Sequence, residues 1–556
     1  MDDKRCCSKC LLYHLPCNLG DNRSGQWTVP SFPQLGFHSF TEHILERKKL
    51  YLLPPECCLL IFDKLVRMHG LALKNLDNFR KCHLPLIHLG GYPGVRDSWM
   101  NVIASQGEFL ISLDISCSIV TDRGLVLLKD CFGLRNLALN YCYQISDRGL
   151  GFMSSLSQLR SLSIIKNKGL TAEGIEAFTN LSNLENLNLE RCSRIHGGLI
   201  HLRGLTKLKS LNIKYCNSVT DEDMEHLSGL TNLNELKMSC TKVTDFGIPY
   251  LSGLHKLSYL DLLGCPVTFA SLETISGFTS LLQLNLNRCD LSDVGCQKLS
   301  ELIQLKDLNL GYNGITNACL INLKGLTNLE SLNLEYCQIS SEGLLSIEGL
   351  TSLRTLELSE TGVEALSHLS GLHNLENLNL SCTSVEDDNL AALSTLTSLK
   401  SLNLDHLEIS DASLPFLSIF SGLTHLDLSG CCLFGFGMGY LYFTNLQSLE
   451  ISDGFLNDFC TRSIKDLTSL KLLNLSYNSE ITDVTLERIS GLTALCSLNL
   501  SNTAVTGAGL RHLKPLTNLR SLYLNNTRMS ALWLWTYQRY VLSNLVIFQP
   551  RWSSKT

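Results

Sequence analysis

The chain has 556 residues, a formal net charge of −6 and only 12 prolines, and 116 of its residues are leucine. One residue used this heavily indicates a single packing unit repeated many times, and repetition lengthens a chain without enlarging its core. Hydrophobic residues at 44% and charged residues at 18% exclude an intrinsically disordered chain. No apolar run approaches the roughly 18 residues of a membrane span. The balance of 46 basic to 52 acidic residues gives no electrostatic footprint for nucleic acid.

The cysteines bear on the cellular compartment. There are 23 of them, an odd number, and the chain begins MDDKRCCSKC, which is polar and lacks the apolar core of a secretory signal. Free thiols persist in a reducing compartment. We therefore expect a cytoplasmic and/or nuclear protein.

Residues 1–50 lack any period and are predicted to form a disordered or irregular tail. Within them, Cys7, Cys10, His14 and Cys17 bring four potential zinc ligands close together, at spacings shorter than those of ordinary zinc fingers. Reversible acylation of the adjacent cysteine pair is a second alternative. We favour an exposed tail without a metal.

Residues 51–83 are predicted to form a helical segment ahead of the repeats. In YLLPPECCLLIFDKLVR, Pro54 sits where a helix would begin and Glu56 falls in its first turn. One interpretation is an N-terminal cap, because a solenoid needs its first repeat shielded from water.

The stretch LPPECCLLIFDKL also resembles the opening helix of an F-box, whose pattern is LPxExxxxIFxxL. The tryptophan that usually closes that motif is missing, so this F-box would be truncated or degenerate. The resemblance implies contact with a Skp-type adaptor of a cullin ubiquitin ligase. The matching residues are Leu53, Pro54, Glu56, Ile61, Phe62 and Leu65.

From residue 84 to residue 530 the sequence repeats itself about nineteen times, mostly every 24 or 25 residues. The consensus is LxxLxLxxCxxITDxGLxxLxGLTx. The first two repeats begin at Leu84, where the pattern is degenerate, and at Leu110. The others begin at Leu134, Leu159, Leu184, Leu208, Leu233, Leu257, Leu281, Leu305, Leu329, Leu353, Leu375, Leu399, Leu423, Leu446, Leu470, Leu495 and Leu519.

Each repeat is predicted to contain one short strand and one short helix. In LESLNLEYC, Leu332 and Leu334 would point inward while Ser331, Asn333 and Glu335 point outward, because side chains alternate along a strand. The later GLxxLxGL segment has helical spacing, and its glycines and preceding Asp or Ser residues suit turns and a helix N-cap. A single repeat cannot bury its own leucines, so stacking must bury them between neighbours.

In most repeats the eighth residue after the leading leucine is Cys, Asn or Thr, which are small and carry a polar atom that can bond the backbone of the turn leaving the strand. Stacked cysteines there could instead form disulfides or bind a metal. We favour buried cysteine as a small hydrophobe, because asparagine and threonine interchange with it and neither replaces a thiolate. The cysteines are Cys142, Cys192, Cys216, Cys265, Cys289, Cys337 and Cys431, the asparagines Asn167, Asn313 and Asn478, and the threonines Thr241, Thr361, Thr383, Thr503 and Thr527.

Taken together, residues 51–530 resemble the cysteine-containing class of leucine-rich repeats, and in particular the F-box/LRR proteins of plants. The turns VTDRGL, ISDRGL, VTDEDM and ITDVTL carry this resemblance. It implies an α/β leucine-rich-repeat solenoid, a horseshoe of about nineteen strand–helix repeats with a parallel concave sheet. It also implies that the repeats recruit a protein substrate and that the F-box tethers it to an SCF-type ligase.

One column of outward residues differs from the polar background. The seventh residue after the leading leucine is often tyrosine or arginine, the residue types that dominate interface hot spots. We predict a partner-binding strip, the alternative being ordinary tyrosines that lean on their neighbours. The strip would comprise Tyr141, Arg191, Tyr215, Arg288, Tyr312, Tyr336 and Tyr477.

Two stretches depart from the consensus. CCLFGFGMGYLYF, from Cys431, loses the TDxGL turn and carries Phe434, Phe436, Tyr440 and Tyr442. It is either an exposed binding loop or sequence drift packed into the core, and we favour drift. Residues 531–556 leave the period, and we predict a C-terminal cap there.

No HExxH, GxSxG, P-loop or paired-carboxylate arrangement stands outside the repeat consensus. We therefore predict a non-catalytic protein-interaction module without cofactor or metal, whose partners are a Skp-type adaptor and an unknown protein substrate. The function predicted is substrate recognition for an SCF-type E3 ubiquitin ligase. The alternative is a repeat scaffold or signalling protein with no ligase association.

Overall fold

The computed structural model describes residues 50–529 and 547–549. Residue contacts divide the chain into two compact units, the first ending at Asp261 and the second beginning at Leu262. The potential zinc ligands of the tail and the two tryptophans at positions 533 and 535 lie outside the described residues.

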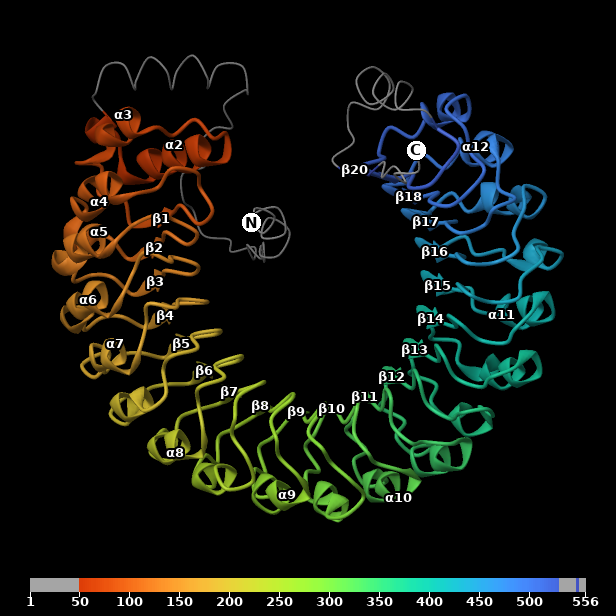
Figure 1. Ribbon diagram of the computed structural model, residues 1–556, viewed down its shortest axis with the longest axis horizontal. Coiled ribbons are helices and arrows are strands. Elements are labelled where there is room, and N and C mark those ends of the chain that lie inside the picture. Colours follow the sequence, from red (N-terminus) through yellow and green to blue (C-terminus); the bar gives the residue numbers. More distant parts are fainter. Residues whose placement is uncertain (1–49, 530–546, 550–556) are drawn as a thin grey trace, which may run out of the picture. The chain divides into compact units, whose positions relative to one another are not determined.

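Strands of three residues recur through both units, and in each unit they line one side while the helices line the other (Figure 1). In the N-terminal unit they are β1 (Leu86–His88), β2 (Ser112–Asp114), β3 (Asn136–Ala138), β4 (Ser161–Ser163), β5 (Asn186–Asn188), β6 (Ser210–Asn212), β7 (Glu235–Lys237) and β8 (Tyr259–Asp261). In the C-terminal unit they are β9 (Gln283–Asn285), β10 (Asp307–Asn309), β11 (Ser331–Asn333), β12 (Thr355–Glu357), β13 (Asn377–Asn379), β14 (Ser401–Asn403), β15 (His425–Asp427), β16 (Ser448–Glu450), β17 (Leu472–Asn474), β18 (Ser497–Asn499), β19 (Ser521–Tyr523) and β20 (Ile547–Gln549).

Strands β1 to β19 each begin two residues after a predicted leading leucine, so the predicted repeat solenoid is confirmed. Within each unit neighbouring strands pair in parallel and keep one register, as in Leu308 opposite Leu332. The inward leucines are buried, and Leu332 and Leu334 are both 0% exposed. Strand β20 falls inside the predicted C-terminal cap and pairs with β19 in parallel, which the sequence analysis did not foresee.

The connections back from each strand contain short helices. The α-helices are α2 (Pro55–Arg67), α3 (Leu73–Leu76), α4 (Asp97–Ala104), α5 (Asp122–Leu125), α6 (Asp147–Leu150), α7 (Ala172–Glu176) and α8 (Asp221–Met224), then α9 (Phe269–Ile275), α10 (Asn317–Leu320), α11 (Leu414–Leu417) and α12 (Asp483–Ile489). The 3-10 helices are η1 (Leu50–Leu52), η2 (Asp77–Phe79), η3 (Gly107–Phe109), η4 (Val126–Asp130), η5 (Gly151–Ser155), η6 (Gly198–Leu202), η7 (Glu225–Leu227) and η8 (Ile248–Leu251), then η9 (Cys296–Glu301), η10 (Ile321–Leu323), η11 (Ser341–Ser346), η12 (Ser367–Leu369), η13 (Asp387–Thr395), η14 (Asp411–Ser413), η15 (Met438–Tyr440), η16 (Cys460–Arg462), η17 (Ile464–Asp466) and η18 (Gly509–Leu513).

In many repeats the TDxGL turn joins the repeat to the one before it. Thr171 caps α7 with its hydroxyl, and its own backbone N–H and hydroxyl donate to Asp147 of the preceding repeat at 2.8 and 2.6 Å. In the C-terminal unit Thr506 donates in the same way to Asp483, at 2.7 Å for both bonds. We call this series the aspartate ladder. The other threonine or serine and aspartate pairs are Thr121–Asp97, Ser146–Asp122, Thr244–Asp221, Thr316–Asp293, Ser410–Asp387 and Thr482–Asp458.

The glycine of TDxGL follows from the same ladder. A Cβ added to Gly174 would collide with the carboxylate of Asp147, and one added to Gly509 would collide with Asp483. Hydrogen is the only side chain that leaves room for the aspartate. The glycine is therefore required by the preceding repeat rather than by its own backbone.

The eighth-position residues act as predicted, as small donors to backbone carbonyls. Cys192 Sγ donates to the carbonyl of Ile164 at 3.0 Å, and Asn313 Nδ2 donates to that of Leu286 at 2.8 Å. Both acceptors belong to the preceding repeat. Thr503 instead donates to the carbonyl of Leu500 in its own repeat, at 2.7 Å. Burial raises the pKa of the Cys192 thiol to about 11, so this cysteine is protonated at neutral pH and unsuited to metal ligation.

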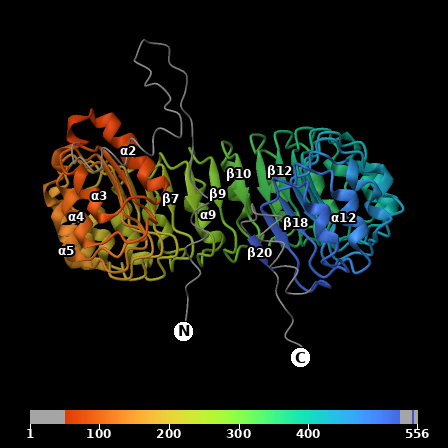
Figure 2. The ribbon, with the colours of Figure 1, turned by 90° about the horizontal axis from the view of Figure 1, so that it is seen from above.

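Figures 1 and 2 show α2 at the end of the N-terminal unit, beside α3 and ahead of α4. Its inner side is buried, since Ile61 is 4% exposed and Phe62 0% exposed. The Phe62 ring meets the Phe79 ring edge-on, with centroids 5.3 Å apart. Cys58 Sγ donates to the carbonyl of Leu50 at 3.2 Å. These contacts hold α2 against η1 and η2, ahead of the first repeat.

The favoured interpretation of the stretch from Cys431 is wrong. Four of its aromatic side chains do not pack into the core, since Phe434, Phe436, Tyr440 and Tyr442 are 52%, 83%, 51% and 79% exposed, whereas Phe443 is 1% exposed. The core positions are filled instead by the residues between them, including Leu433, Met438 and Leu441. The repeat keeps its packing while these four aromatic side chains face solvent.

A disulfide that the sequence analysis did not predict joins Cys296 and Cys319 of adjacent repeats. Neither cysteine belongs to the eighth-position column. Potential ligand atoms of Asp293, Cys296 and Cys319 lie within 4.8 Å of one another. Asp293 is already engaged in the aspartate ladder, where it accepts two hydrogen bonds from Thr316.

Candidate partner-binding surface

The predicted partner-binding residues all share one unusual backbone conformation. Each residue seven places after a leading leucine has a positive φ, for example 60° at Tyr141, 55° at Tyr312 and 60° at Tyr477. We call this series the turn column. Its N–H groups donate to the next repeat, as Tyr312 N–H does to the carbonyl of Glu335 at 2.7 Å. The left-handed turn thus continues the parallel bonding beyond each strand.

This conformation favours glycine, which Gly264 and Gly430 supply at φ 66° in two repeats. A residue with a Cβ costs roughly 1–2 kcal/mol in the left-handed region. Tyrosine and arginine at this position therefore need a compensating contribution from their side chains.

In the C-terminal unit three members of the turn column stack on one another. The Arg288 guanidinium lies 4.2 Å from the centroid of the Tyr312 ring. The Tyr312 and Tyr336 rings are parallel within 15°, with centroids 5.1 Å apart. The Tyr312 hydroxyl donates to Glu335 at 2.8 Å, and this bond raises the pKa of Tyr312. We call these three residues the tyrosine stack.

In the N-terminal unit the column forms smaller clusters. The Arg191 guanidinium lies 4.4 Å from the Tyr215 ring centroid. Tyr141 lies beside Lys166, whose ammonium is 5.9 Å from the ring centroid, and beside Tyr143. The structure therefore brings the predicted residues together in one pair, Arg191 with Tyr215, and one triple, while Tyr141 lies beside residues outside the predicted set.

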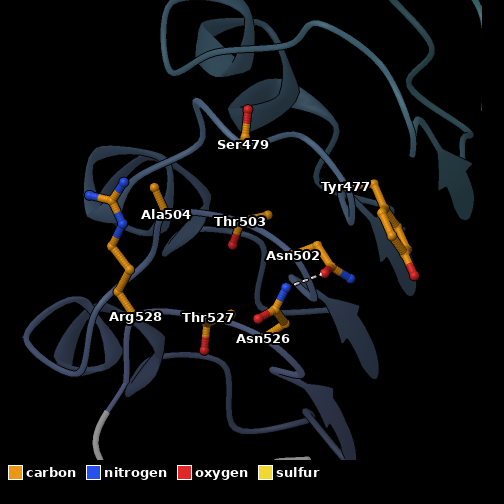
Figure 3. A pocket seen from close by; sticks show the side chains of 8 residues that line it. All are labelled: Tyr477, Ser479, Asn502, Thr503, Ala504, Asn526, Thr527 and Arg528. Carbon is orange, nitrogen blue, oxygen red and sulfur yellow. Dashed lines mark hydrogen bonds between the residues drawn. The ribbon is translucent and has the colours of Figure 1, made fainter. Parts of the chain in front are cut away.

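Tyr477 stands apart from the other predicted residues. It borders a shallow hollow of about 480 Å³ in the C-terminal unit, with Arg528 on the opposite side (Figure 3). Between them Asn526 Nδ2 donates to Asn502 Oδ1 at 2.7 Å. The other lining residues are Ser479, Thr503, Ala504 and Thr527.

The outward residues of the strands differ in charge between the two units. In the N-terminal unit Lys214 pairs with Asp261 at 2.6 Å, and Lys237 pairs with Glu235 at 2.5 Å. In the C-terminal unit strands β10 to β16 and their turns carry carboxylates without such partners. From the sequence these positions were expected only to be polar. Summing the formal charge at each outward position over consecutive repeats would have revealed the excess of carboxylates.

The predicted adaptor-binding residues differ in how far they are buried. Pro54 and Glu56 are exposed, and Leu53 and Leu65 are half-buried. Ile61 and Phe62 are buried in the cap. The exposed apolar side chains near this helix instead include Leu52 and Leu60, at 66% and 54%, and Met68, at 53%.

A second exposed aromatic group was found only in part from the sequence. The Phe434 and Phe455 rings stack with centroids 5.1 Å apart. The Arg462 guanidinium lies 4.7 Å from the Phe459 ring centroid. Phe455 and Phe459 are 60% and 56% exposed and were not singled out from the sequence, because both stand at variable positions of the consensus.

Comparison with known proteins identifies the repeat. One model of the leucine-rich repeat matches residues 444–505, and a second matches residues 204–228, 279–300 and 325–347. No curated protein matches the chain. Within residues 50–529 and 547–549, every helix is too short or too polar to cross a bilayer.

Several solved structures are similar to the chain at low sequence identity. An internalin, inlF, from Listeria monocytogenes is 23% identical, with 72% of this chain and 89% of that chain covered and a TM-score of 0.37. The plant peptide hormone receptor RGFR1, in complex with RGF2, is 18% identical over 85% of this chain and 80% of that chain, with a TM-score of 0.43. TLR13, in complex with ssRNA13, is 23% identical over 80% of this chain and 65% of that chain, with a TM-score of 0.49.

Proposed function

Because the chain is a leucine-rich-repeat protein, we propose that it is a protein-interaction module that binds a protein partner along the turn column. The observation that supports this site is the tyrosine stack. It places tyrosine and arginine side chains in a left-handed turn that glycine would occupy with less strain. Tyrosine and arginine are also the side chains that contribute most at protein interfaces.

Affinity purification from the source tissue tests this binding site. Tyr312→Ala combined with Tyr336→Ala should reduce partner recovery at least tenfold, measured by quantitative mass spectrometry. Tyr440→Ala combined with Tyr442→Ala is the matched control, because these tyrosines are exposed but lie off the turn column. Equal recovery by both folded variants would refute the turn column as the binding site.

The finer proposal is that the partner is a substrate of an SCF-type E3 ubiquitin ligase, in the cytoplasm or nucleus. It rests on the match of LPPECCLLIFDKL, which lies in α2 and the two residues before it, to the first helix of an F-box. Exposed Leu52 and Leu60 offer an apolar surface for a Skp-type adaptor. The chain would act by proximity, because holding a target near activated ubiquitin raises the effective concentration of its lysines.

A pull-down with a purified Skp-type adaptor tests this role. Ile61→Asp and Phe62→Asp are unsuitable, because they would bury a charge inside the cap. Leu52→Asp combined with Leu60→Asp should abolish adaptor binding and leave the fold intact. Leu345→Asp, at an exposed leucine of the C-terminal unit, serves as the control. Absence of binding by the wild-type chain would favour a scaffold without ligase association.

A further inference from the structure

The outward residues of β10 to β16 and their turns carry one sign of charge. Four outward positions per repeat lie two, four, six and seven residues after the leading leucine. Across the repeats that begin at Leu305 and end with the one from Leu446, these positions hold no lysine or arginine. They hold the following carboxylates, which we call the acidic strip: Asp307, Glu335, Glu357, Glu360, Asp405, Asp427, Glu450 and Asp453.

The protein does not neutralise the acidic strip from within. Among the described residues, the one ion pair that involves it joins Asp405 to His406 at 2.7 Å. The neighbouring column, one residue after each leading leucine, is balanced by its own pairs. There Lys400 and Arg354 both bind Glu376, at 2.5 and 2.6 Å.

The carboxylates of the acidic strip also act on one another. Burial raises the pKa of Glu357, and the charge of Glu335 raises it further. Burial likewise raises the pKa of Asp427, with further contributions from Glu450 and Asp405. A cation brought to this face would relieve this repulsion.

The turn column beside the strip already binds guanidinium groups. Arg288 covers one face of Tyr312, and Arg191 covers Tyr215 in the same way in the other unit. Tyr336 ends the tyrosine stack and is 56% exposed. The next member of the column is Glu360, an exposed carboxylate whose charge contributes to the raised pKa of Tyr312. An aromatic ring between carboxylates suits an arginine side chain, which stacks on rings and forms ion pairs at once.

We propose that the partner segment bound by the C-terminal unit is basic, and that one of its arginines stacks on Tyr336 while Glu335, Glu357 and Glu360 balance its charge. This inference rests on the proposed function, since it specifies the chemistry of the partner at the turn column. The complementary charges would also accelerate association and make it sensitive to salt. The same charges would repel polyanions such as nucleic acid.

A labelled probe peptide of six Arg-Gly dipeptides tests this, with fluorescence anisotropy on the full-length chain. The peptide should bind more tightly than its Lys-Gly counterpart, and a Glu-Gly peptide should not bind. Tyr336→Ala, and separately Glu357→Gln combined with Glu360→Gln, should each weaken binding at least tenfold. The matched variants Tyr250→Ala and Glu190→Gln, in the N-terminal unit and off the turn column, should leave binding unchanged.

Three results would overturn the inference: no binding of the Arg-Gly peptide, equal binding of the Glu-Gly peptide, or unchanged binding by the Tyr336 and glutamate variants. The outcome is separable from that of the proposed function. If partner capture depends on Tyr312 and Tyr336 but cross-linking maps a neutral or acidic partner segment to this face, the basic-segment inference fails and the proposed function stands. If the alanine variants capture the partner normally, the proposed function fails as well.

Discussion

The outward faces of the two units share one scaffold and differ in how they handle charge. In the N-terminal unit lysines form ion pairs with two carboxylates. Lys214, for example, pairs with Asp261, whose side chain is 1% exposed. In the C-terminal unit the acidic strip faces solvent without lysine or arginine partners among the described residues. The inward leucines are buried alike in both units. Outward residues can therefore change the recognition chemistry without disturbing the core.

The largest expected effect comes from breaking the buried ion pair of the N-terminal unit. Lys214→Ala leaves Asp261 buried without its cation, and losing one partner of such a pair typically costs about 3 kcal/mol. We expect urea denaturation to show a loss of this order. Lys209→Ala, at an exposed pair with Glu185, should cost less than about 1 kcal/mol. Equal losses in the two variants would contradict the distinction.

The aspartate ladder should respond equally in both units, because it belongs to the shared scaffold. Asp147→Ala and Asp483→Ala each remove an acceptor of two hydrogen bonds. Hydrogen bonds to a charged group contribute about 1.5–3 kcal/mol each but are not additive. We expect each variant to lower the free energy of unfolding by about 2 kcal/mol. Glu176→Ala, an exposed residue at the end of α7, should change it by less than about 0.5 kcal/mol.

Removing a charge from the acidic strip should raise the free energy of unfolding rather than lower it. The pKa of Glu357 is raised in the folded chain, so its stabilising contribution is present below the unfolded pKa and is lost as the pH rises through the folded pKa. Glu357→Gln should therefore stabilise the chain at pH 7 relative to wild type, and this advantage should disappear near pH 4. Thermal denaturation at the two pH values measures the difference. Glu376→Gln, at a carboxylate paired with Lys400, should give no gain at pH 7.

The smallest expected effect distinguishes the backbone strain of the turn column from the contacts that its side chains make. Cys382 has φ 53°, and Cys382→Gly should relieve the left-handed strain, for a net gain of about 0.5 kcal/mol after the entropy cost of glycine. Tyr312→Gly should give no gain, because it also removes the contacts with Arg288 and Tyr336. Thermal melts of the two variants make the comparison. A larger gain for Tyr312→Gly would show that the tyrosine stack contributes nothing to stability.

The repeat period predicted the strands because leucine at alternate positions can only be buried in one way. It also predicted the eighth-position donors, since Cys, Asn and Thr share a small size and a polar atom. The partner of the TDxGL aspartate was not predictable, because Asp147 bonds the following repeat rather than its own. The stretch from Cys431 misled for a related reason. Aromatic residues indicate burial on average, but here they occupy turn positions while Leu433 and Met438 fill the core.

The candidate site was predicted in part. The spacing identified Tyr312 and Tyr336 as neighbours in one column, but it could not show that their rings stack or that Arg288 covers the first of them. The adaptor-binding residues were chosen by motif alone, and a motif does not reveal which side of α2 faces the core. That is why Ile61 and Phe62 proved to be buried.

The aspartate ladder has a consequence for how such an array can change. A TDxGL glycine such as Gly174 makes room for an aspartate that another repeat supplies, so the two positions are constrained as a pair across the repeat boundary. Where Cys460 replaces this glycine, the preceding repeat carries Gly435 at the aspartate position, and a Cβ there would collide with the Cys460 sulfur. A repeat moved to another position in the array would therefore contact a neighbour whose residue at the paired position does not match its own. Exchanging one residue of the pair would then require a compensating exchange of the other.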